Sequence, residues 1–327
     1  MKIACYLPEI IFTNSDFERE FPDWNASKIE EKVGIRQRHL SAKGETALDM
    51  AFQASERVLD GEDKGTVDFI LLCTQSPDYF LPTSACILQE KLGLSNKTGA
   101  LDYNLGCSGF IYGLALAKGL LAAGIATRIL LIMSETYSKH LHPADRANRS
   151  IFGDGAAAIL LDINDLPHIG SFELGTDGSG KNNLIVEAGA MRKPCVSESV
   201  AIANEDGTFH SPNHLYMNGP EIFNFTIESV PGLVSSVLQK NNLSLEEIDY
   251  VIFHQANKYM LEYLRKKIRI PAEKYYNNML MTGNTVSATI PIAMVESLEQ
   301  GKIKPGSKLL LVGFGVGYSW GAVVITW

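Results

Sequence analysis

The feature that most constrains the fold is an internal repetition of apolar segments. Three segments of the first half return in the same order in the second half: residues 66–76 with 247–257, 127–132 with 307–312, and 155–161 with 321–327. Each segment is rich in Val, Ile, Leu or Ala, a composition typical of strands buried on both faces. One such pair could be a coincidence, but three pairs in one order indicate two copies of a folding unit.

Helical segments separate the apolar strands within each copy. The clearest expected helices cover residues 48–59, 110–123, 222–240 and 291–300. This alternation predicts a layered α/β fold with helices packed on mostly parallel or mixed sheets. We expect an N-terminal half over residues 1–166 and a C-terminal half over residues 167–327. The polar stretch 186–214 lacks periodicity and is expected to form a long excursion over a pocket.

Charge and cysteine usage narrow the classes of partner and compartment. The formal net charge of −8 leaves no overall basic surface, so we expect no nucleic acid partner. The five cysteines include no Cys-x-x-Cys pair, which argues against a disulfide framework and favours a reducing compartment. Pro8 and Glu9 interrupt the first residues, which do not resemble a secretory signal, and Lys118 interrupts the most apolar helix. We expect a cytoplasmic protein that binds no membrane.

Cys107 is the candidate nucleophile. Residues 104–110, Asn-Leu-Gly-Cys-Ser-Gly-Phe, place it between two glycines, after the apolar run 99–105 and before the helical stretch 110–123. The glycines permit a sharp turn from strand to helix. The amides of the first helical turn are expected to stabilise a thiolate and to lower its pKa. The alternative is a small buried hydrophobic residue at a strand–helix corner.

His254 follows the first apolar segment of the second copy, in the run Phe-His-Gln-Ala-Asn that ends at Asn257. Ligand sites collect at the carboxyl ends of strands in α/β sheets, and of the seven histidines only His254 is so placed. The alternative is a structural histidine at a strand end.

Asn284 lies in the loop Gly-Asn-Thr-Val-Ser, just before the helical stretch 288–300. In the repeat this loop stands opposite the Gly-Cys-Ser-Gly turn, so Asn284 and Cys107 are expected on facing loops. Taken alone, an ordinary turn with an N-cap explains the loop better. Together with His254, however, these residues come from three loops at matching topological positions, as converging catalytic groups require.

Two further motifs are set aside. Residues 177–181, Asp-Gly-Ser-Gly-Lys, lack the spacing of a phosphate-binding loop and are predicted to form a turn. His140 and His142 have no acidic or cysteine neighbours at metal-ligand spacing, so we predict no metal.

The three candidate residues and their surroundings resemble β-ketoacyl-acyl carrier protein synthase III, a family of condensing enzymes in the thiolase superfamily. The matching motifs run through essentially the whole chain: Gly34-Ile-Arg-Gln-Arg38, Gly106-Cys-Ser-Gly109, Phe152-Gly-Asp-Gly155, His254-Gln-Ala-Asn257, Gly283-Asn-Thr285 and Gly317-Tyr-Ser-Trp-Gly321. As a set they are highly specific. The resemblance implies a five-layered α-β-α-β-α fold of two duplicated halves, a homodimer, and no cofactor besides the thioester substrates.

The resemblance also implies a mechanism. Cys107 takes an acyl group from a primer, either acyl-CoA or acyl carrier protein, and malonyl-acyl carrier protein then loses carbon dioxide and attacks the acyl-cysteine. His254 and Asn284 are expected, as neutral hydrogen-bond donors, to hold the malonyl thioester oxygen as it becomes an enolate. The backbone amides of Cys107 and Val316 are expected to form the oxyanion hole of the tetrahedral intermediates. The product is a 3-oxoacyl thioester for fatty-acid or related polyketide synthesis.

Several positions depart from acetyl-CoA-primed members and bear on the substrate. Lys28 stands where those enzymes carry a tryptophan that stacks on the adenine of CoA, whereas Arg146 matches the other half of that clamp. With Arg36 of the first motif, these residues are the implied contacts to CoA and pantetheine. Leu81 stands where many members carry a phenylalanine that limits the acyl pocket across the dimer interface, so a longer or branched acyl group is expected to fit.

Two other departures concern carrier docking and the oxyanion hole. Tyr259 replaces an arginine that usually helps to dock the carrier protein, and Val316 replaces the middle glycine of a Gly-Gly-Gly turn. A valine is strained at positive φ, so we expect either extended backbone at Val316 or an altered oxyanion hole.

Acidic carrier proteins need a local basic face on a chain that is acidic overall. Lys258, Arg265, Lys266 and Arg269 follow His254 on a predicted helix, and Lys258, Arg265 and Arg269 are spaced for one side. This patch is the predicted docking site, with a solvated helix surface as the alternative.

Other functions of the same residues are a divergent acyltransferase with a longer acyl chain or a different acceptor, and a non-catalytic carrier-binding subunit. An intact set of Cys107, His254 and Asn284 argues against the second of these. A cysteine hydrolase fits less well, because a site that excludes water to protect an enolate is poorly suited to hydrolysis.

Overall fold

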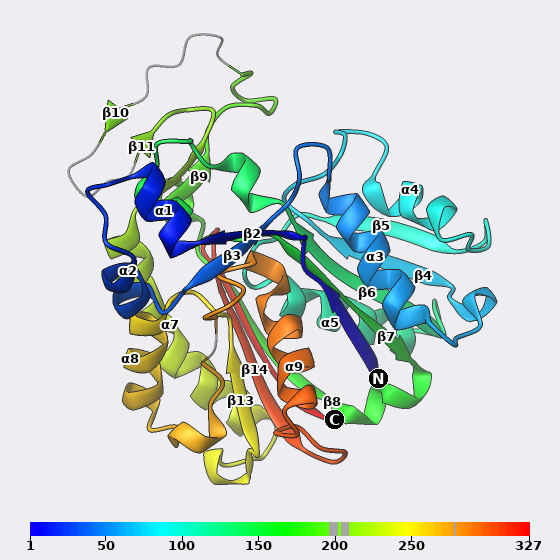
Figure 1. Ribbon diagram of the computed structural model, residues 1–327. Helices are drawn as coiled ribbons and strands as arrows, with labels where there is room; N and C mark the ends of the chain where they lie inside the picture. The colour runs from blue at the N-terminus through cyan, green and yellow to red at the C-terminus, as the bar shows by residue number, and fades with distance from the viewer. Residues whose placement is uncertain (196–201, 204–208, 278) are drawn as a thin grey trace.

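Two mixed β-sheets organise the molecule (Figure 1). The computed structural model describes residues 1–195, 202–203, 209–277 and 279–327. The first sheet has the order β1-β7-β6-β4-β5, with strands β1 (Lys2–Tyr6), β4 (Phe69–Cys73), β5 (Gly99–Tyr103), β6 (Arg128–Glu135) and β7 (Gly155–Asp162). The second has the order β13-β14-β15-β8, with strands β8 (Ile169–Thr176), β13 (Tyr250–Phe253), β14 (Lys308–Gly315) and β15 (Ser319–Thr326).

Three layers of helix alternate with these sheets. The central layer consists of α5 (Gly109–Ala122) and α9 (Thr289–Glu299), whose apolar residues share one core with the inner faces of both sheets. The first sheet carries α3 (Ala47–Leu59) and α4 (Ser84–Lys91) on its outer face, and the second carries α7 (Gly219–Lys240) and α8 (Lys258–Ile268) on its own. The five-layered fold is thereby confirmed.

The strands pack on both faces, which explains their unbroken apolar sequences. In β4, Leu71 belongs to the central core, whereas its neighbours Ile70 and Leu72 belong to the core beneath α3 and α4. Side chains of a strand alternate between its two faces, so a strand covered on both sides is apolar at every position.

The predicted repeat corresponds to equivalent strands. The paired segments form β4 and β13, β6 and β14, and β7 and β15. In each sheet the first two of these strands are parallel, and the third is antiparallel to the second. The predicted boundary between residues 166 and 167 falls in the short helix Ile163–His168, which separates the strands of the two sheets.

Smaller elements lie outside the two sheets and the helices that cover them. They are the hairpin β2 (Ile10–Thr13) and β3 (Gln37–Leu40), the helices α1 (Asn14–Glu20), α2 (Ala26–Val33) and α6 (Arg146–Arg149), and the short strands β9 (Leu184–Val186), β10 (Ile202–Ala203), β11 (Phe209–His210) and β12 (Leu215–Met217). Residues 177–181 form a turn at the 3₁₀ helix Gly178–Asn182, as predicted. The predicted excursion 186–214 falls partly outside the described residues. In the part of the chain that the structure describes, no helix has the length and apolar character needed to cross a membrane.

Candidate active site

Cys107 lies in the turn between β5 and α5, one residue before the helix N-cap Ser108. Its side chain is buried, with 6% of the residue exposed. Two glycines permit the close packing around this turn. A Cβ on Gly315 would lie 3.0 Å from the sulfur of Cys107, and a Cβ on Gly106 would lie 2.6 Å from Val316. The turn therefore has the predicted position and needs glycine at both neighbouring backbones.

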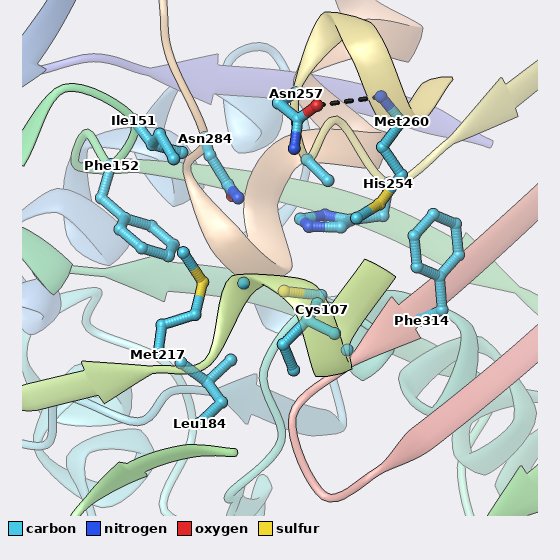
Figure 2. A pocket seen from close by; sticks show the side chains of 14 residues that line it. Cys107, Ile151, Phe152, Leu184, Met217, His254, Asn257, Met260, Asn284 and Phe314 are labelled. Atoms are coloured by element: carbon cyan, nitrogen blue, oxygen red, sulfur yellow. Dashed lines mark hydrogen bonds between the residues drawn. The ribbon is translucent and has the colours of Figure 1, made fainter. Parts of the chain in front are cut away.

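His254 follows β13 directly and is held at its backbone and at one edge of its ring. Its N–H donates to the Val312 carbonyl across the sheet at 2.8 Å. Its Nδ1 lies 2.7 Å from the hydroxyl of Thr289, the first residue of α9. The Phe314 ring contacts the imidazole edge-on, with centroids 5.7 Å apart. The opposite edge of the imidazole faces the pocket that Cys107 lines (Figure 2).

Asn284 is oriented by the turn that contains it. Its Oδ1 accepts the N–H of Val286 at 2.9 Å, which leaves the amide nitrogen Nδ2 toward the pocket. Its backbone N–H donates to the Ile151 carbonyl at 2.9 Å. Gly283 has φ +69°, and a Cβ there would lie 2.9 Å from the same carbonyl. The glycine before Asn284 is thus required by both backbone conformation and space.

The three candidate residues line one inner pocket with about 530 Å³ of empty space, together with apolar side chains (Figure 2). The apolar lining consists of Ile151, Phe152, Leu184, Met217, Ile222, Ala256, Met260 and Phe314. A wider outer pocket with about 2130 Å³ of empty space shares Ile151, Met217, Gly219, Asn257 and Met260 with it. The buried thiol is therefore reached through an outer vestibule.

The pKa of Cys107 is shifted in the direction opposite to the one expected. Burial, with a contribution from the Glu135 carboxylate, raises the pKa of Cys107 to about 12. The backbone amides of Cys107 and Val316 act in the opposite direction but do not outweigh burial. The expected lowering of the thiol pKa was therefore wrong, because the sequence reveals the helix start but not how deeply the sulfur is buried. Burial also lowers the pKa of His254 to about 3, so the imidazole is neutral.

Val316 is accommodated in the tight turn between β14 and β15. Among the described residues it is not one of those with positive φ, and the left-handed conformation falls on Gly317, at φ +140°. The valine is therefore free of the strain that would have altered the turn.

The residues expected to contact CoA lie at different places. Lys28 of α2 lines the vestibule, together with Lys32 and Lys258. Arg36 makes an exposed salt bridge to Glu30 at 3.0 Å. The guanidinium of Arg146 lies 5.8 Å from the ring centre of Trp24 and 6.0 Å from that of Phe21. Arg36 and Arg146 do not line either pocket.

The expected carrier-docking residues are spread along α8. Lys258 begins the helix at the vestibule. Arg265 is engaged by the Glu262 carboxylate at 3.0 Å and by the Ile270 carbonyl at 3.1 Å. Arg269 is the C-cap, and with a rise of 1.5 Å per residue it lies about 16 Å along the helix axis from Lys258. Lys258 alone of this set borders the vestibule.

Leu81 is 83% exposed and lies outside both pockets. It is in the loop between β4 and α4, beside the exposed rings of Tyr79 and Phe80. Within one chain, therefore, Leu81 does not meet Cys107.

Some residues of the site were missed by sequence reasoning. Thr289 contacts His254, and Met217 and Phe152 line the inner pocket. Trp24 lies four residues before Lys28, at the position where Arg146 stacks. Nothing in the local sequence distinguishes Thr289 or Met217, because each becomes part of the site only through a long-range contact. The only sequence signal for Trp24 is an aromatic residue four positions before Lys28.

Two family models match the chain. One describes the C-terminal part of 3-oxoacyl-[acyl-carrier-protein] synthase III and matches residues 238–327, and the other describes 3-oxoacyl-[acyl-carrier-protein] synthase III and matches residues 101–178. A relative named beta-ketoacyl-[acyl-carrier-protein] synthase III from Clostridium perfringens is 37% identical, covering 98% of this chain and 97% of its own. Its counterpart from Fusobacterium nucleatum is 35% identical, covering 99% and 97%.

A solved structure gives the same result at the level of the fold. A crystal structure of a 3-oxoacyl-(acyl-carrier-protein) synthase III superposes with a TM-score of 0.97 and 45% identity, covering 99% of this chain and 98% of that one. Sequence identity over nearly the full length thus accompanies the shared fold, the buried cysteine and the two side chains that face it. The chain belongs to the 3-oxoacyl-[acyl-carrier-protein] synthase III family of condensing enzymes.

Proposed function

We propose that the protein joins a primer acyl thioester to malonyl-acyl carrier protein by decarboxylating Claisen condensation, which gives 3-oxoacyl-acyl carrier protein, carbon dioxide and the free primer thiol. The observation that carries this proposal is the convergence of Cys107, His254 and Asn284 on one buried, largely apolar pocket. A thiol at such a place can hold an acyl group as a thioester while water is excluded.

Acyl transfer to Cys107 is the first step. The thiol and the imidazole are both neutral in the free site, so the reaction begins when His254 takes the thiol proton on Nε2. The sulfur attacks the acyl carbonyl, and the backbone amides of Cys107 and Val316 stabilise the oxyanion. The C–S bond to the primer then breaks, and the departing thiolate takes the proton from Nε2 of His254, which returns the imidazole to its neutral form.

Condensation is the second step. A solvent proton enters on Nε2 of His254 as the anionic malonyl thioester binds. Asn284 Nδ2 and this Nε2–H then donate to the malonyl thioester oxygen while the bond to the carboxylate breaks and carbon dioxide leaves. The resulting enolate carbon attacks the acyl-cysteine, and the C–S bond to Cys107 breaks. The proton on Nε2 returns to the sulfur, so one solvent proton is consumed over the whole reaction.

The vestibule is suited to the polar part of the thioester substrates. Three lysines, Lys28, Lys32 and Lys258, line it beside the carboxylates of Glu31 and Glu262, and the ammonium groups can complement the phosphate of CoA or of a carrier-bound pantetheine. We assign the carrier protein to the Lys258 side, and CoA to Lys28, Arg36 and Arg146. No cofactor enters the proposed reaction.

We also propose that the enzyme acts as a homodimer. Tyr79, Phe80 and Leu81 expose 61%, 75% and 83% of their surface on one loop. A contiguous apolar surface of this kind on a folded chain is characteristic of a protein interface. A second copy seated on this loop would bring Leu81 to the acyl pocket of its partner.

Intact-protein mass spectrometry tests the function directly. The wild type is mixed with acyl-CoAs and acyl carrier proteins of different chain lengths and is then chased with malonyl-acyl carrier protein. We expect an acyl adduct on Cys107 that the malonyl thioester discharges with release of carbon dioxide, and no adduct on the folded Cys107→Ala variant. An adduct that malonyl leaves unchanged would contradict the condensing function, and an acylated Cys107→Ala variant would contradict the nucleophile assignment.

A further inference from the structure

A buried hydroxyl lies behind the imidazole of His254, on the edge away from the inner pocket. Thr289 is 2% exposed, and its Oγ1 lies 2.7 Å from Nδ1 of His254 and 3.0 Å from the Val286 carbonyl oxygen. Thr289 does not line the inner pocket. The hydroxyl can therefore act on the reaction only through the imidazole.

The geometry of the Thr289 hydroxyl indicates the direction of these hydrogen bonds. The hydroxyl donates its single proton to the Val286 carbonyl at 3.0 Å, and the same carbonyl also accepts the backbone N–H of Thr289. The hydroxyl oxygen must then accept from Nδ1 of His254, which places the proton of the neutral imidazole on Nδ1. The Val286 carbonyl also favours the protonated imidazole. Nε2, at the edge facing the pocket, is consequently a lone-pair acceptor.

The same turn makes Asn284 a hydrogen-bond donor toward the pocket, whereas Nε2 of His254 is an acceptor. The N–H of Val286 donates to Oδ1, which leaves the N–H groups of Nδ2 for the pocket. Val286 has φ +57°, a conformation that β-branched residues rarely adopt. Its N–H binds the side chain of Asn284, and its carbonyl binds the side chain of Thr289. The pocket therefore receives a donor from Asn284 and an acceptor from His254.

We propose that Thr289 is a positioning residue for the reaction, because its hydroxyl holds the proton of His254 on Nδ1 and so leaves Nε2 ready to accept the proton of the Cys107 thiol. This proposal deepens the proposed function and rests on it for the acyl transfer step alone. The tautomer of His254 in the free enzyme is independent of any substrate.

The tautomer is measured by ¹⁵N NMR on the full-length protein labelled at histidine, with the His254 signals assigned by comparison with His254→Asn. We expect a protonated-type signal for Nδ1 and an unprotonated-type signal for Nε2 in the wild type, and loss of that preference in Thr289→Val, which keeps the shape but removes the hydroxyl. A proton on Nε2 of the wild type would overturn the proposal, whatever the enzyme catalyses.

Acylation kinetics give the second readout. A positioned general base contributes about 10²–10⁴-fold, and we expect Thr289→Val to lower the rate of Cys107 acylation about 10- to 100-fold with little change in the KM for the acyl thioester. Thr289→Ser should restore most of the rate. The matched control is Thr226→Val, which removes a buried hydroxyl donating to the Ile222 carbonyl in α7, away from His254.

The outcomes distinguish a failure of the proposed function from a failure of the role of Thr289. Absence of acylation in the wild type would contradict the proposed function and leave the NMR result to decide the tautomer. A wild type that is acylated and a Thr289→Val variant acylated equally fast would overturn the role of Thr289 alone. A slow Thr289→Val variant that Thr289→Ser fails to rescue would also overturn it, because the loss would then come from packing.

Discussion

Backbone groups of single residues determine the polarity of the site. Val286 illustrates this, since its N–H orients Asn284 and its carbonyl holds Thr289, which in turn contacts His254. A non-glycine residue at positive φ costs on the order of 1–3 kcal/mol and persists only where the surroundings enforce it. Val286 is therefore connected by hydrogen bonds to both side chains that face the Cys107 thiol, directly to Asn284 and through Thr289 to His254.

The raised pKa of Cys107 leads to a prediction about its reactivity. The thiolate fraction of a thiol rises about tenfold per pH unit below its pKa, so alkylation of Cys107 by iodoacetamide should increase steadily from pH 7 to pH 9.5 without a plateau. The measurement is the alkylation rate of the Cys107 peptide in a Cys86→Ser, Cys195→Ser background, because those two cysteines are exposed.

Free cysteine is the control for this measurement, because its pKa of about 8.5 makes its rate level off within the same range. A plateau for Cys107 anywhere between pH 7 and pH 9.5 would contradict the raised pKa. The raised pKa of Cys107 also affects the free energy of unfolding. The folded-state pKa of about 12 exceeds that of the unfolded thiol, so the folded state favours the neutral thiol. The free energy of unfolding therefore declines as the pH rises above about 8.5, where the unfolded thiol ionises.

Sequence reasoning at this scale identified residues but not their environments. Glycine turns and strand ends are local signals that led to Cys107, His254 and Asn284, and the structure brings these three residues to one pocket. The protonation of Cys107 and the role of Thr289 could not be predicted, because burial and contacts between residues 35 positions apart depend on the packed fold.

Close contacts between the backbones of neighbouring helices, strands and turns determine the position of Cys107. The turn before α5 lies against the end of β14, and the contact between them leaves no space for a side chain on Gly315. The alternation of buried strands and helices predicted α3, α5, α7 and α9 to within a few residues, and the structure confirms them. The contact between the turn and the strand is long-range, so its dependence on Gly315 was not predicted.

Gly315→Ala tests this contact. The new Cβ would lie 2.8 Å from the Cβ of Cys107 and 3.0 Å from its sulfur, so the nucleophile must shift. A misplacement of about 1 Å can reduce a rate about 100-fold, and we expect a loss of acylation of that order by mass spectrometry. Unchanged acylation would show that the turn has more freedom than the contact implies.

Gly119→Ala is the matched control for Gly315→Ala. Gly119 lies within α5, and a Cβ added to it would meet no atom of a neighbouring element within 4 Å, so alanine fits there. We expect normal acylation and a gain of about 0.5–1 kcal/mol in the free energy of unfolding, because glycine disfavours the helix interior.

The molecule consists of two duplicated halves that contribute different residues to the site. Cys107 belongs to the half that contains the first sheet, whereas His254 and Asn284 belong to the half that contains the second. The proposed nucleophile therefore comes from one half and the proposed proton-handling groups from the other. The repeat made this architecture predictable from sequence, but the sequence of one chain does not report contacts with a second copy.

The proposed dimer is tested by sedimentation at micromolar concentration. We expect a dimer for the wild type and a shift toward monomer for Leu81→Asp combined with Phe80→Asp, because both side chains would place charge in an apolar interface. Ile125→Asp is the control, since Ile125 is 66% exposed after α5 and outside that loop. A monomeric wild type would refute the dimer.

The vestibule and inner pocket together impose a length requirement on any reactant. Cys107 lines the inner pocket but not the vestibule, so a thioester carbon reaches the sulfur only at the end of a slender chain whose bulky portion stays outside. A thioester on a short handle would have the same bond to break but would lack the reach to present it. We therefore expect selection to act partly on the spacer between the bulky group and the reacting carbon, independently of the acyl group itself.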